Sequence, residues 1–226
     1  MNPPDAETIE LLPAAGLPRQ LFVLLHDAGD TGTDMLALGE VLGDAFAQAV
    51  VVIPEGLTGA TPGFEELAGL EEGELYLPET SPENPPAGLP GRVETLAAFL
   101  RAQQQRFGLL QSASALLGFG AGASLALALS AAHDGLVGRV LAFGGTHAAW
   151  PAGAPQLTTL HLLHGQRDLV VPVRRVREAY ELLMALSADA TLDVASSVGH
   201  ELHPALMEQA VTRLQTCVPL RFWKAL

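Results

Sequence analysis

Residues 113–132, ASALLGFGAGASLALALSAA, carry no charged side chain. A run of about 20 apolar residues can span a bilayer as a helix, and its Gly-x-x-x-Gly spacing suits helix pairing in lipid. A core helix is a second interpretation, and a buried strand that turns sharply into a buried helix is a third. Three glycines alternate over 118–122, which favours a tight strand-to-helix turn over one continuous helix. The sequence therefore predicts a strand over Ser114–Phe119 and a helix over Ala121–Ala132.

Short, nearly continuous apolar runs recur along the chain between turn residues, as in strands that are covered on both faces. Helical patterns separate these runs, which indicates an α/β fold, a mostly parallel sheet with helices on both faces. The other predicted strands are Glu7–Leu12 (the weakest), Gln20–His26, Ala49–Pro54, Arg139–Gly144, Thr158–His164 and Thr191–Ser196, and the other predicted helices are Thr33–Leu42, Arg92–Phe107, Val173–Leu186 and Pro204–Thr216.

Composition limits the class of protein and its partners. The chain has 226 residues, of which 49% are hydrophobic and 16% charged, and this fits a single globular domain over 1–226 with a large core. A net charge of −13 argues against nucleic acid and against anionic membranes as partners. The single cysteine, Cys217, lies in an apolar helical pattern and is expected to be a buried structural thiol. The acidic N-terminus lacks a secretory signal pattern, so a cytoplasmic location is expected.

Residues 56–91 interrupt the alternation of strands and helices. They are rich in Pro, Gly and Glu and show little periodicity. Segments of this length inside a compact domain are either lids over a site or solvated surface loops, and the sequence leaves both interpretations open. If the segment is a lid, Tyr76 and its leucine neighbours are expected to face the site.

Polar residues follow several of the predicted strands, where ligands bind in open α/β sheets. Gly118-Phe119-Gly120-Ala121-Gly122 has the glycines of the nucleophile elbow G-x-S-x-G, in which the central serine stands clear of the sheet. His26 opens a His-x-x-Gly turn of the kind that supplies an oxyanion N–H. Asp168 and His200 follow later strands, in the order in which acid and base follow the elbow in this architecture.

Together these segments resemble the phospholipase/carboxylesterase family of small α/β-hydrolases, and especially a bacterial serine-esterase branch, from about Leu21 to the C-terminus. The resemblance rests on HDAGDTG (26–32), LLGFGAGASLAL (116–127), HLLHGQRDLVVPV (161–173) and VGHELHP (198–204). It implies that Asp168 is the acid and His200 the base, and that the N–H groups of Ala28 and Ala121 line an oxyanion hole. It also implies a small-molecule ester or acyl ligand and no cofactor.

The chain departs from the family pattern at three positions. Gly120 stands where the family has its nucleophilic serine, Ala121 where Gln is usual and Asp27 where Gly is usual. Without the serine no acyl-enzyme forms by the usual route, so hydrolysis of carboxylic esters is expected to be weak or absent. The alternative is a non-catalytic pseudo-hydrolase that binds a small apolar ester or carboxylate. His26, Asp27 and Tyr76 are the expected pocket residues.

Two groups are candidates for replacement chemistry at position 120, a water molecule and Ser124. A water above Gly120, polarised by His200, is one hypothesis for slow residual hydrolysis. Asp27, if it faces the site, would oppose developing negative charge there. Ser124 lies on the same helix face as Gly120 but is better explained as a core hydroxyl bonded to a preceding carbonyl. No metal set is expected, since no cysteine or carboxylate spacing completes one with the histidines. The sequence leaves the acyl-chain length and the oligomeric state open.

Overall fold

The computed structural model describes residues 8–13, 16–57, 88–148, 153–217 and 219. This part of the chain forms one seven-stranded sheet with the strand order β1-β3-β2-β4-β5-β6-β7. Strand β1 pairs antiparallel with β3, and every other pairing is parallel. The strands are β1 Thr8–Leu11, β2 Gln20–Leu25, β3 Ala49–Pro54, β4 Ser114–Phe119, β5 Arg139–Phe143, β6 Thr159–Gly165 and β7 Ala190–Ala195.

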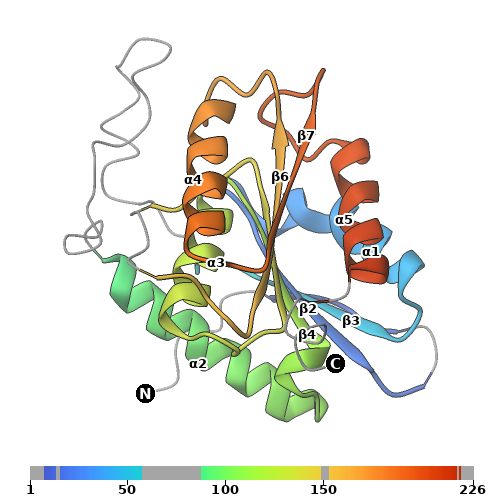
Figure 1. Ribbon diagram of the computed structural model, residues 1–226. Helices are drawn as coiled ribbons and strands as arrows, with labels where there is room; N and C mark the ends of the chain where they lie inside the picture. Colours follow the sequence, from blue (N-terminus) through green and yellow to red (C-terminus); the bar gives the residue numbers. More distant parts are fainter. Residues whose placement is uncertain (1–7, 14–15, 58–87, 149–152, 218, 220–226) are drawn as a thin grey trace.

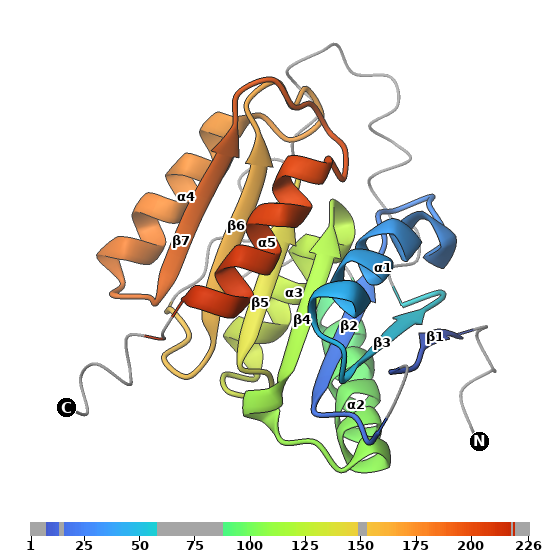
Figure 2. The ribbon, with the colours of Figure 1, turned by 90° about the vertical axis from the view of Figure 1, so that its right-hand side faces the viewer.

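Helices cover both faces of the sheet, as Figures 1 and 2 show. One face packs against α2, α3 and α4, and the other against α1 and α5, so the core has two layers. The strands β3, β4 and β6 are buried along their whole length, as their mostly apolar sequences predict. The helices are α1 Leu36–Ala45, α2 Leu89–Phe107, α3 Ala121–Ala132, α4 Val173–Ala185 and α5 Pro204–Thr216.

The predicted α/β-hydrolase architecture is confirmed, with adjustments at several element ends. The helix predicted from Thr33 is a 3-10 turn, η1 Gly32–Met35, followed by α1. Asp34 accepts the Thr31 N–H in a capping box, which fixes this tight first turn. A second 3-10 turn, η2 Gln111–Ala113, precedes β4.

Two further expectations change. Helix α2 begins at Leu89, inside the segment predicted to be a lid or loop, and residues 58–87 of that segment, including Tyr76, lie outside the described residues.

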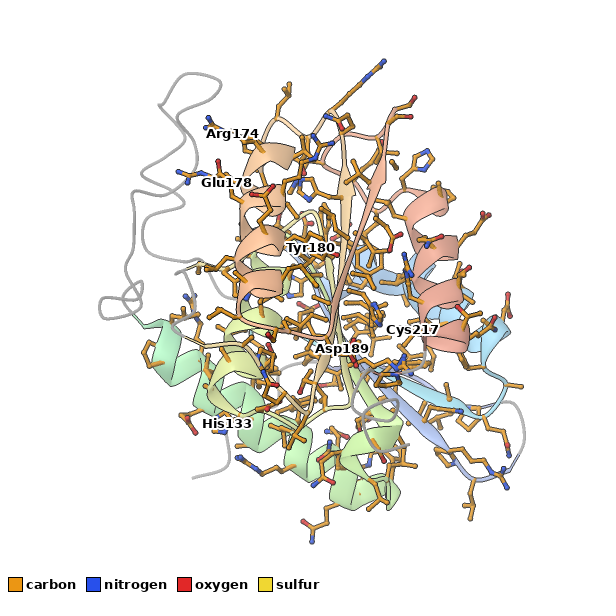
Figure 3. All side chains as sticks on the ribbon, in the orientation of Figure 1. His133, Arg174, Glu178, Tyr180, Asp189 and Cys217 are labelled. Carbon is orange, nitrogen blue, oxygen red and sulfur yellow. The ribbon has the colours of Figure 1, made fainter. Side chains whose placement is uncertain are left out.

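Cys217 caps the C-terminus of α5 and is only half-buried, so the prediction of a buried helical thiol was wrong (Figure 3). Its carbonyl accepts a hydrogen bond from the Arg139 guanidinium.

The surface helices show the amphipathic pattern expected of a two-layer cover. In α4, Val176, Ala179 and Leu183 face the sheet, while Arg174 and Glu178 form an exposed ion pair on the outer side (Figure 3). Helix α3 has no such polar face and spans 12 residues. Within the described ranges, no helix is both long and apolar enough to cross a membrane.

The β4–α3 turn depends on close backbone packing at Gly122. A Cβ at this position would lie 2.3 Å from the carbonyl oxygen of Leu25 and 2.7 Å from that of His26. We expect Gly122→Ala to lower the free energy of unfolding by about 3 kcal/mol or more, because backbone must move to admit the methyl group. Urea denaturation measures the change.

Gly91→Ala is the matched control for this substitution. Gly91 is helical in α2, and a Cβ there meets nothing within 4 Å. Alanine is the better helix former by about 1 kcal/mol, so this variant should be as stable as the wild type or more so. Equal stability of the two variants would contradict the close approach at the turn.

Candidate active site

The backbone at Gly120 makes the sharp turn between strand β4 and helix α3. Its φ of 54° and ψ of −114° lie where residues other than glycine store about 1–3 kcal/mol of strain. The Gly120 N–H donates to the Phe143 carbonyl of the neighbouring strand, and the Gly120 carbonyl accepts the Ser124 N–H to open the helix. The predicted strand–turn–helix is therefore present with the predicted bounds.

The space above Gly120 is filled by the carboxylate of Asp27. An ideal Cβ built on Gly120 would lie 2.2 Å from Asp27 Cγ and 2.2 Å from its Oδ1. No side chain can therefore occupy position 120 while Asp27 stays in place. The hypothesis of a water lodged above Gly120 is wrong for the same reason, because the carboxylate occupies that volume.

Two backbone N–H groups hold this carboxylate by one oxygen. Oδ1 of Asp27 accepts the N–H of Ala28 at 2.7 Å and the N–H of Ala121 at 2.6 Å. These are the two N–H groups expected to line an oxyanion hole, and they converge on a single point. Both are satisfied by a side chain of the protein itself.

His200 connects Asp27 with Asp168. Its Nδ1 lies 2.8 Å from Asp168 Oδ2, and its Nε2 lies 3.2 Å from Asp27 Oδ2. The imidazole ring also packs on Phe119, with 4.7 Å between the ring centroids. The expected acid and base thus meet each other and point toward Gly120, which the sequence predicted. The second carboxylate on the base was not predicted.

Asp168 is fixed by backbone as well as by His200. Its side chain is fully buried, and Oδ1 accepts the N–H groups of Val170 and Val171 at 2.9 and 2.8 Å. His164 Nε2 lies 3.3 Å from Oδ2 and 2.7 Å from the Val171 carbonyl. Because carbonyl oxygen only accepts, His164 Nε2 carries the proton and supports the turn that presents Asp168.

The charges at the site favour an ion pair between His200 and the two carboxylates. Burial alone lowers the pKa of His200, but the hydrogen bonds and charges of Asp168 and Asp27 outweigh it and raise the pKa to about 9. Burial raises the pKa of Asp27, but the hydrogen bonds from His200, Ala121 and Ala28 bring it below its usual value. At neutral pH His200 is therefore an imidazolium and Asp27 a carboxylate.

The other predicted residues lie around this centre. His26 is buried and donates from Nδ1 to the Asp27 carbonyl, while its Nε2 lies 3.6 Å from Glu55. His26 thus supports the loop that carries Asp27. Ser124 donates to the Thr146 carbonyl at 2.7 Å and lies 3.4 Å from the Gly120 carbonyl, in keeping with the structural role expected of it.

Two other buried histidines, His147 and His161, have no hydrogen bond to the residues of the site among the described contacts. His161 on β6 lies 2.9 Å from Thr191 on β7, and His147 is buried in the loop after β5. Burial lowers the pKa of each to about 4, so both are neutral in the folded protein at pH 7. Among the described residues, no group of three or more His, Cys, Asp or Glu side chains could hold a metal ion.

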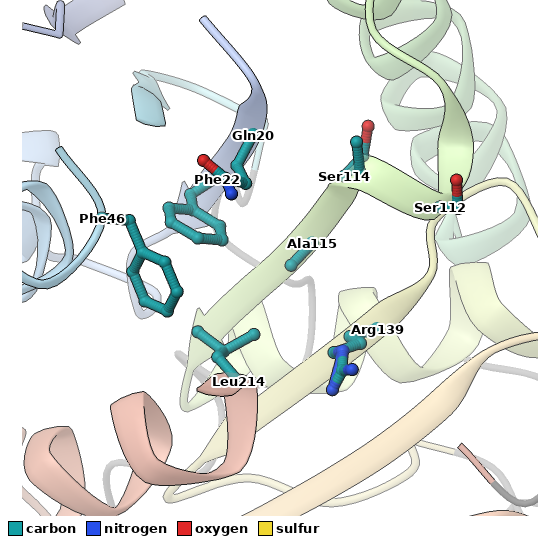
Figure 4. Close-up of a pocket in the computed structure, with 9 residues that line it drawn as sticks. Gln20, Phe22, Phe46, Ser112, Ser114, Ala115, Arg139 and Leu214 are labelled. Atoms are coloured by element: carbon teal, nitrogen blue, oxygen red, sulfur yellow. The ribbon is translucent and has the colours of Figure 1, made fainter. Parts of the chain in front are cut away.

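A cavity of about 170 Å³ lies at the amino-terminal ends of the strands, the ends opposite to the candidate site. Its lining includes Gln20, Ser114 and Arg139, the first residues of β2, β4 and β5, together with Phe22 and Phe46 (Figure 4). The site around Asp27 lies at the carboxyl ends, where ligands bind in sheets of this kind. The cavity is therefore separate from the candidate site.

The sheet order, the sharp turn at Gly120 and the acid–imidazole pair define an α/β-hydrolase. A profile described as Phospholipase/Carboxylesterase matches residues 8–218, and the chain belongs to this family. It is similar to Esterase YpfH of Escherichia coli (strain K12), with 30% identity over 207 residues that cover 91% of this chain and 86% of the relative.

Solved structures agree on the fold. The crystal structure of esterase PE8 aligns with a TM-score of 0.72 and 25% identity, covering 93% of this chain and 98% of that one. A carboxylesterase from Mesorhizobium loti aligns with a TM-score of 0.69 and 19% identity, covering 88% and 90% of the two chains. At 19% identity, the similarity to the Mesorhizobium loti enzyme concerns the fold alone.

Proposed function

We propose that this protein is a carboxylesterase-type hydrolase in which Gly120 has replaced the nucleophilic serine, so that it hydrolyses carboxylic esters weakly or not at all. The single observation that carries the proposal is the position of the Asp27 carboxylate. It fills the volume in which a side chain at residue 120 would stand, and it binds both N–H groups that an ester carbonyl would need. Asp168 and His200 remain as an orienting acid and a base.

The ion pair supports the same conclusion. A general base must be unprotonated to accept a proton, and an imidazole whose pKa is raised to about 9 is mostly protonated at pH 7. A substrate oxyanion would also develop next to the negative charge of Asp27 in a partly buried site. Both effects disfavour water attack on an ester bound at Gly120.

The second candidate is a non-catalytic pseudo-hydrolase that binds a small apolar ester or carboxylate. The filled N–H pair favours it over efficient ester hydrolysis. A ligand that used these N–H groups would first have to displace Asp27, and a carboxylate ligand would meet its charge. Of the two ligand forms, a neutral ester is therefore the better match.

Hydrolysis of p-nitrophenyl acetate by the wild type and by His200→Ala tests the proposal. Ordinary enzymes have kcat/KM values of about 10⁴ M⁻¹s⁻¹ and above. We expect the wild type to fall at least ~10³-fold below that value, because nucleophile removal in a comparable hydrolase lowers turnover by about 10⁶. The rate should change little in His200→Ala. A wild-type rate in the ordinary range that disappears in His200→Ala would overturn the proposal.

A further inference from the structure

The hydrolytic groups of this site converge on a carboxyl carbon that belongs to the protein. Asp27 Cγ carries one oxygen held by the N–H groups of Ala28 and Ala121 and a second oxygen 3.2 Å from His200 Nε2. In acyl transfer, paired N–H groups stabilise the oxygen of the carbonyl under attack, and the imidazole moves the proton of the attacking or leaving oxygen. The same two kinds of group surround Asp27 Cγ.

This arrangement would hydrolyse an ester formed on Asp27 itself. If Oδ2 carried an alkyl group, Oδ1 would be a carbonyl oxygen already seated between the two N–H groups. His200, oriented by Asp168 at 2.8 Å, would stand beside the carbonyl carbon to activate water. The substrate of such a site is then the molecule that alkylates the carboxylate.

We propose that Asp27 is a carboxylate nucleophile and that its substrates are small molecules with an electrophilic saturated carbon, epoxides above all. Carboxylates serve as nucleophiles when a neighbouring base hydrolyses the ester they form. The inference rests on the proposed function in one respect, which is that His200 and Asp168 are the working acid–base pair.

The two steps balance without a co-reactant other than water. In the first, Asp27 Oδ2 attacks an epoxide carbon, the ring C–O bond breaks, and the His200 imidazolium donates its Nε2 proton to the leaving oxygen. In the second, neutral His200 removes a proton from water and the hydroxide adds to Cγ. The C–O bond between Cγ and the alkyl-bearing oxygen then breaks, and the departing alkoxide takes the proton of the new Asp27 carboxyl group. The products are a diol, the Asp27 carboxylate and the imidazolium.

The charges fit this order of events. An epoxide oxygen needs a proton as it leaves, and the ion pair keeps His200 protonated at neutral pH. Alkylation removes the negative charge of Asp27, and with it one hydrogen bond and one charge that hold the proton on His200. The imidazole then becomes a better base at the moment when the second step requires one.

The pair of Asp27 and His200 is also partly exposed. The Asp27 side chain is 19% exposed and that of His200 is 14% exposed, whereas Asp168 is fully buried. A carboxylate oxygen can accept two hydrogen bonds, and within the described residues Oδ2 has the His200 contact while Oδ1 has both N–H contacts. A lone pair on Oδ2 is therefore available for attack, which a carboxylate that served only to fill the site would not need.

The test uses full-length His200→Gln and a small terminal epoxide, 1,2-epoxybutane, alongside the primary halide 1-iodobutane, which needs no acid to react. Without the base, the second step should slow by about 10² to 10⁴. We expect peptide mass spectrometry to find the butyl ester on Asp27 in His200→Gln treated with 1-iodobutane, whereas the epoxide, whose leaving oxygen needs the His200 proton, should alkylate this variant more slowly. In the wild type, a single turnover in water enriched in oxygen-18 should place the heavy isotope in the Asp27 carboxylate and release the diol.

Asp27→Asn and Asp30→Asn are the paired controls. Asp27→Asn should form no adduct and no diol, while Asp30→Asn, which alters an exposed carboxylate nearby, should behave as the wild type does. A folded His200→Gln that carries no ester on Asp27 with either electrophile would overturn the proposal. Asp27 would then only fill the space above Gly120. So would equal labelling of Asp30. Neither outcome bears on the p-nitrophenyl acetate result, so failure of this inference can be told from failure of the proposed function.

Discussion

The double substitution Asp27→Gly with Gly120→Ser should create a serine hydrolase that labels rapidly with a fluorophosphonate. Removal of Asp27 frees the N–H groups of Ala28 and Ala121 and empties the volume above residue 120. The new hydroxyl would then stand beside His200, which Asp168 already orients. We expect labelling and p-nitrophenyl acetate hydrolysis to rise by about 10³-fold or more over the wild type, since loss of the nucleophile accounts for up to about 10⁶.

Gly120→Ser alone is the informative comparison. Its Cβ would lie 2.2 Å from Asp27 Cγ, so Asp27 would have to leave its three hydrogen-bond partners, and its charge would stay close to the developing oxyanion. We expect this variant to label at least ~10²-fold more slowly than the double variant. Asp27→Gly alone should not label, for lack of a nucleophile. Equal labelling of Gly120→Ser and the double variant would show that Asp27 does not block the position.

The stability of the protein should be greatest near pH 6.5 and should fall on both sides. His200 has a pKa of about 9 in the folded protein against 6.5 ordinarily, so its contribution is fully present below pH 6.5 and is lost as the pH rises through 9. At 1.36 kcal/mol per pKa unit this amounts to about 3 kcal/mol. His147 and His161 act in the opposite direction, since their pKa values of about 4 make stability fall as the pH drops from 6.5 to 4.

Urea-unfolding free energies between pH 5 and 9.5 measure both limbs in the wild type and in Asp27→Asn. The substitution removes a hydrogen bond and a charge that raise the pKa of His200, so the alkaline limb should become shallower. The acid limb should keep its slope over pH 5 to 6.5, because burial is the main cause of the lowered pKa values of His147 and His161 and Asp27 is not among the causes. An unchanged alkaline limb in Asp27→Asn would mean that Asp27 and His200 are not paired.

The backbone of this protein follows closely from local patterns in its sequence. Strand β4 and helix α3 have the predicted bounds because an unbroken apolar run and alternating glycines determine them together. The prediction of an α-helix from Thr33 was wrong for its first turn. The capping box of Thr31 and Asp34 tightens the backbone there into the 3-10 turn η1. Strand β7 begins one residue earlier than predicted, at Ala190, where partial burial along the whole strand weakens the apolar signal.

The position of Asp27 was harder to predict, because it depends on a residue far along the chain. The Ala121 N–H and Asp27 are separated by 94 positions, and the rotamer of Asp27 is possible only because Gly120 has no side chain. The signal available in the sequence was the joint departure of Asp27 and Gly120 from the family pattern. The two departures have one physical explanation. The carboxylate of Asp27 occupies the space in which a side chain at position 120 would stand.

Both the proposed function and the proposed role of Asp27 require its carboxylate to lie between two backbone amides and an imidazole. Scalar couplings across hydrogen bonds, measured by NMR on isotope-labelled protein, test it directly. We predict couplings from the amide nitrogens of both Ala28 and Ala121 to the side-chain carboxyl carbon of Asp27, because both N–H groups donate to Oδ1 at 2.7 and 2.6 Å. Amides that show no such coupling and exchange with solvent as freely as exposed loops would contradict it.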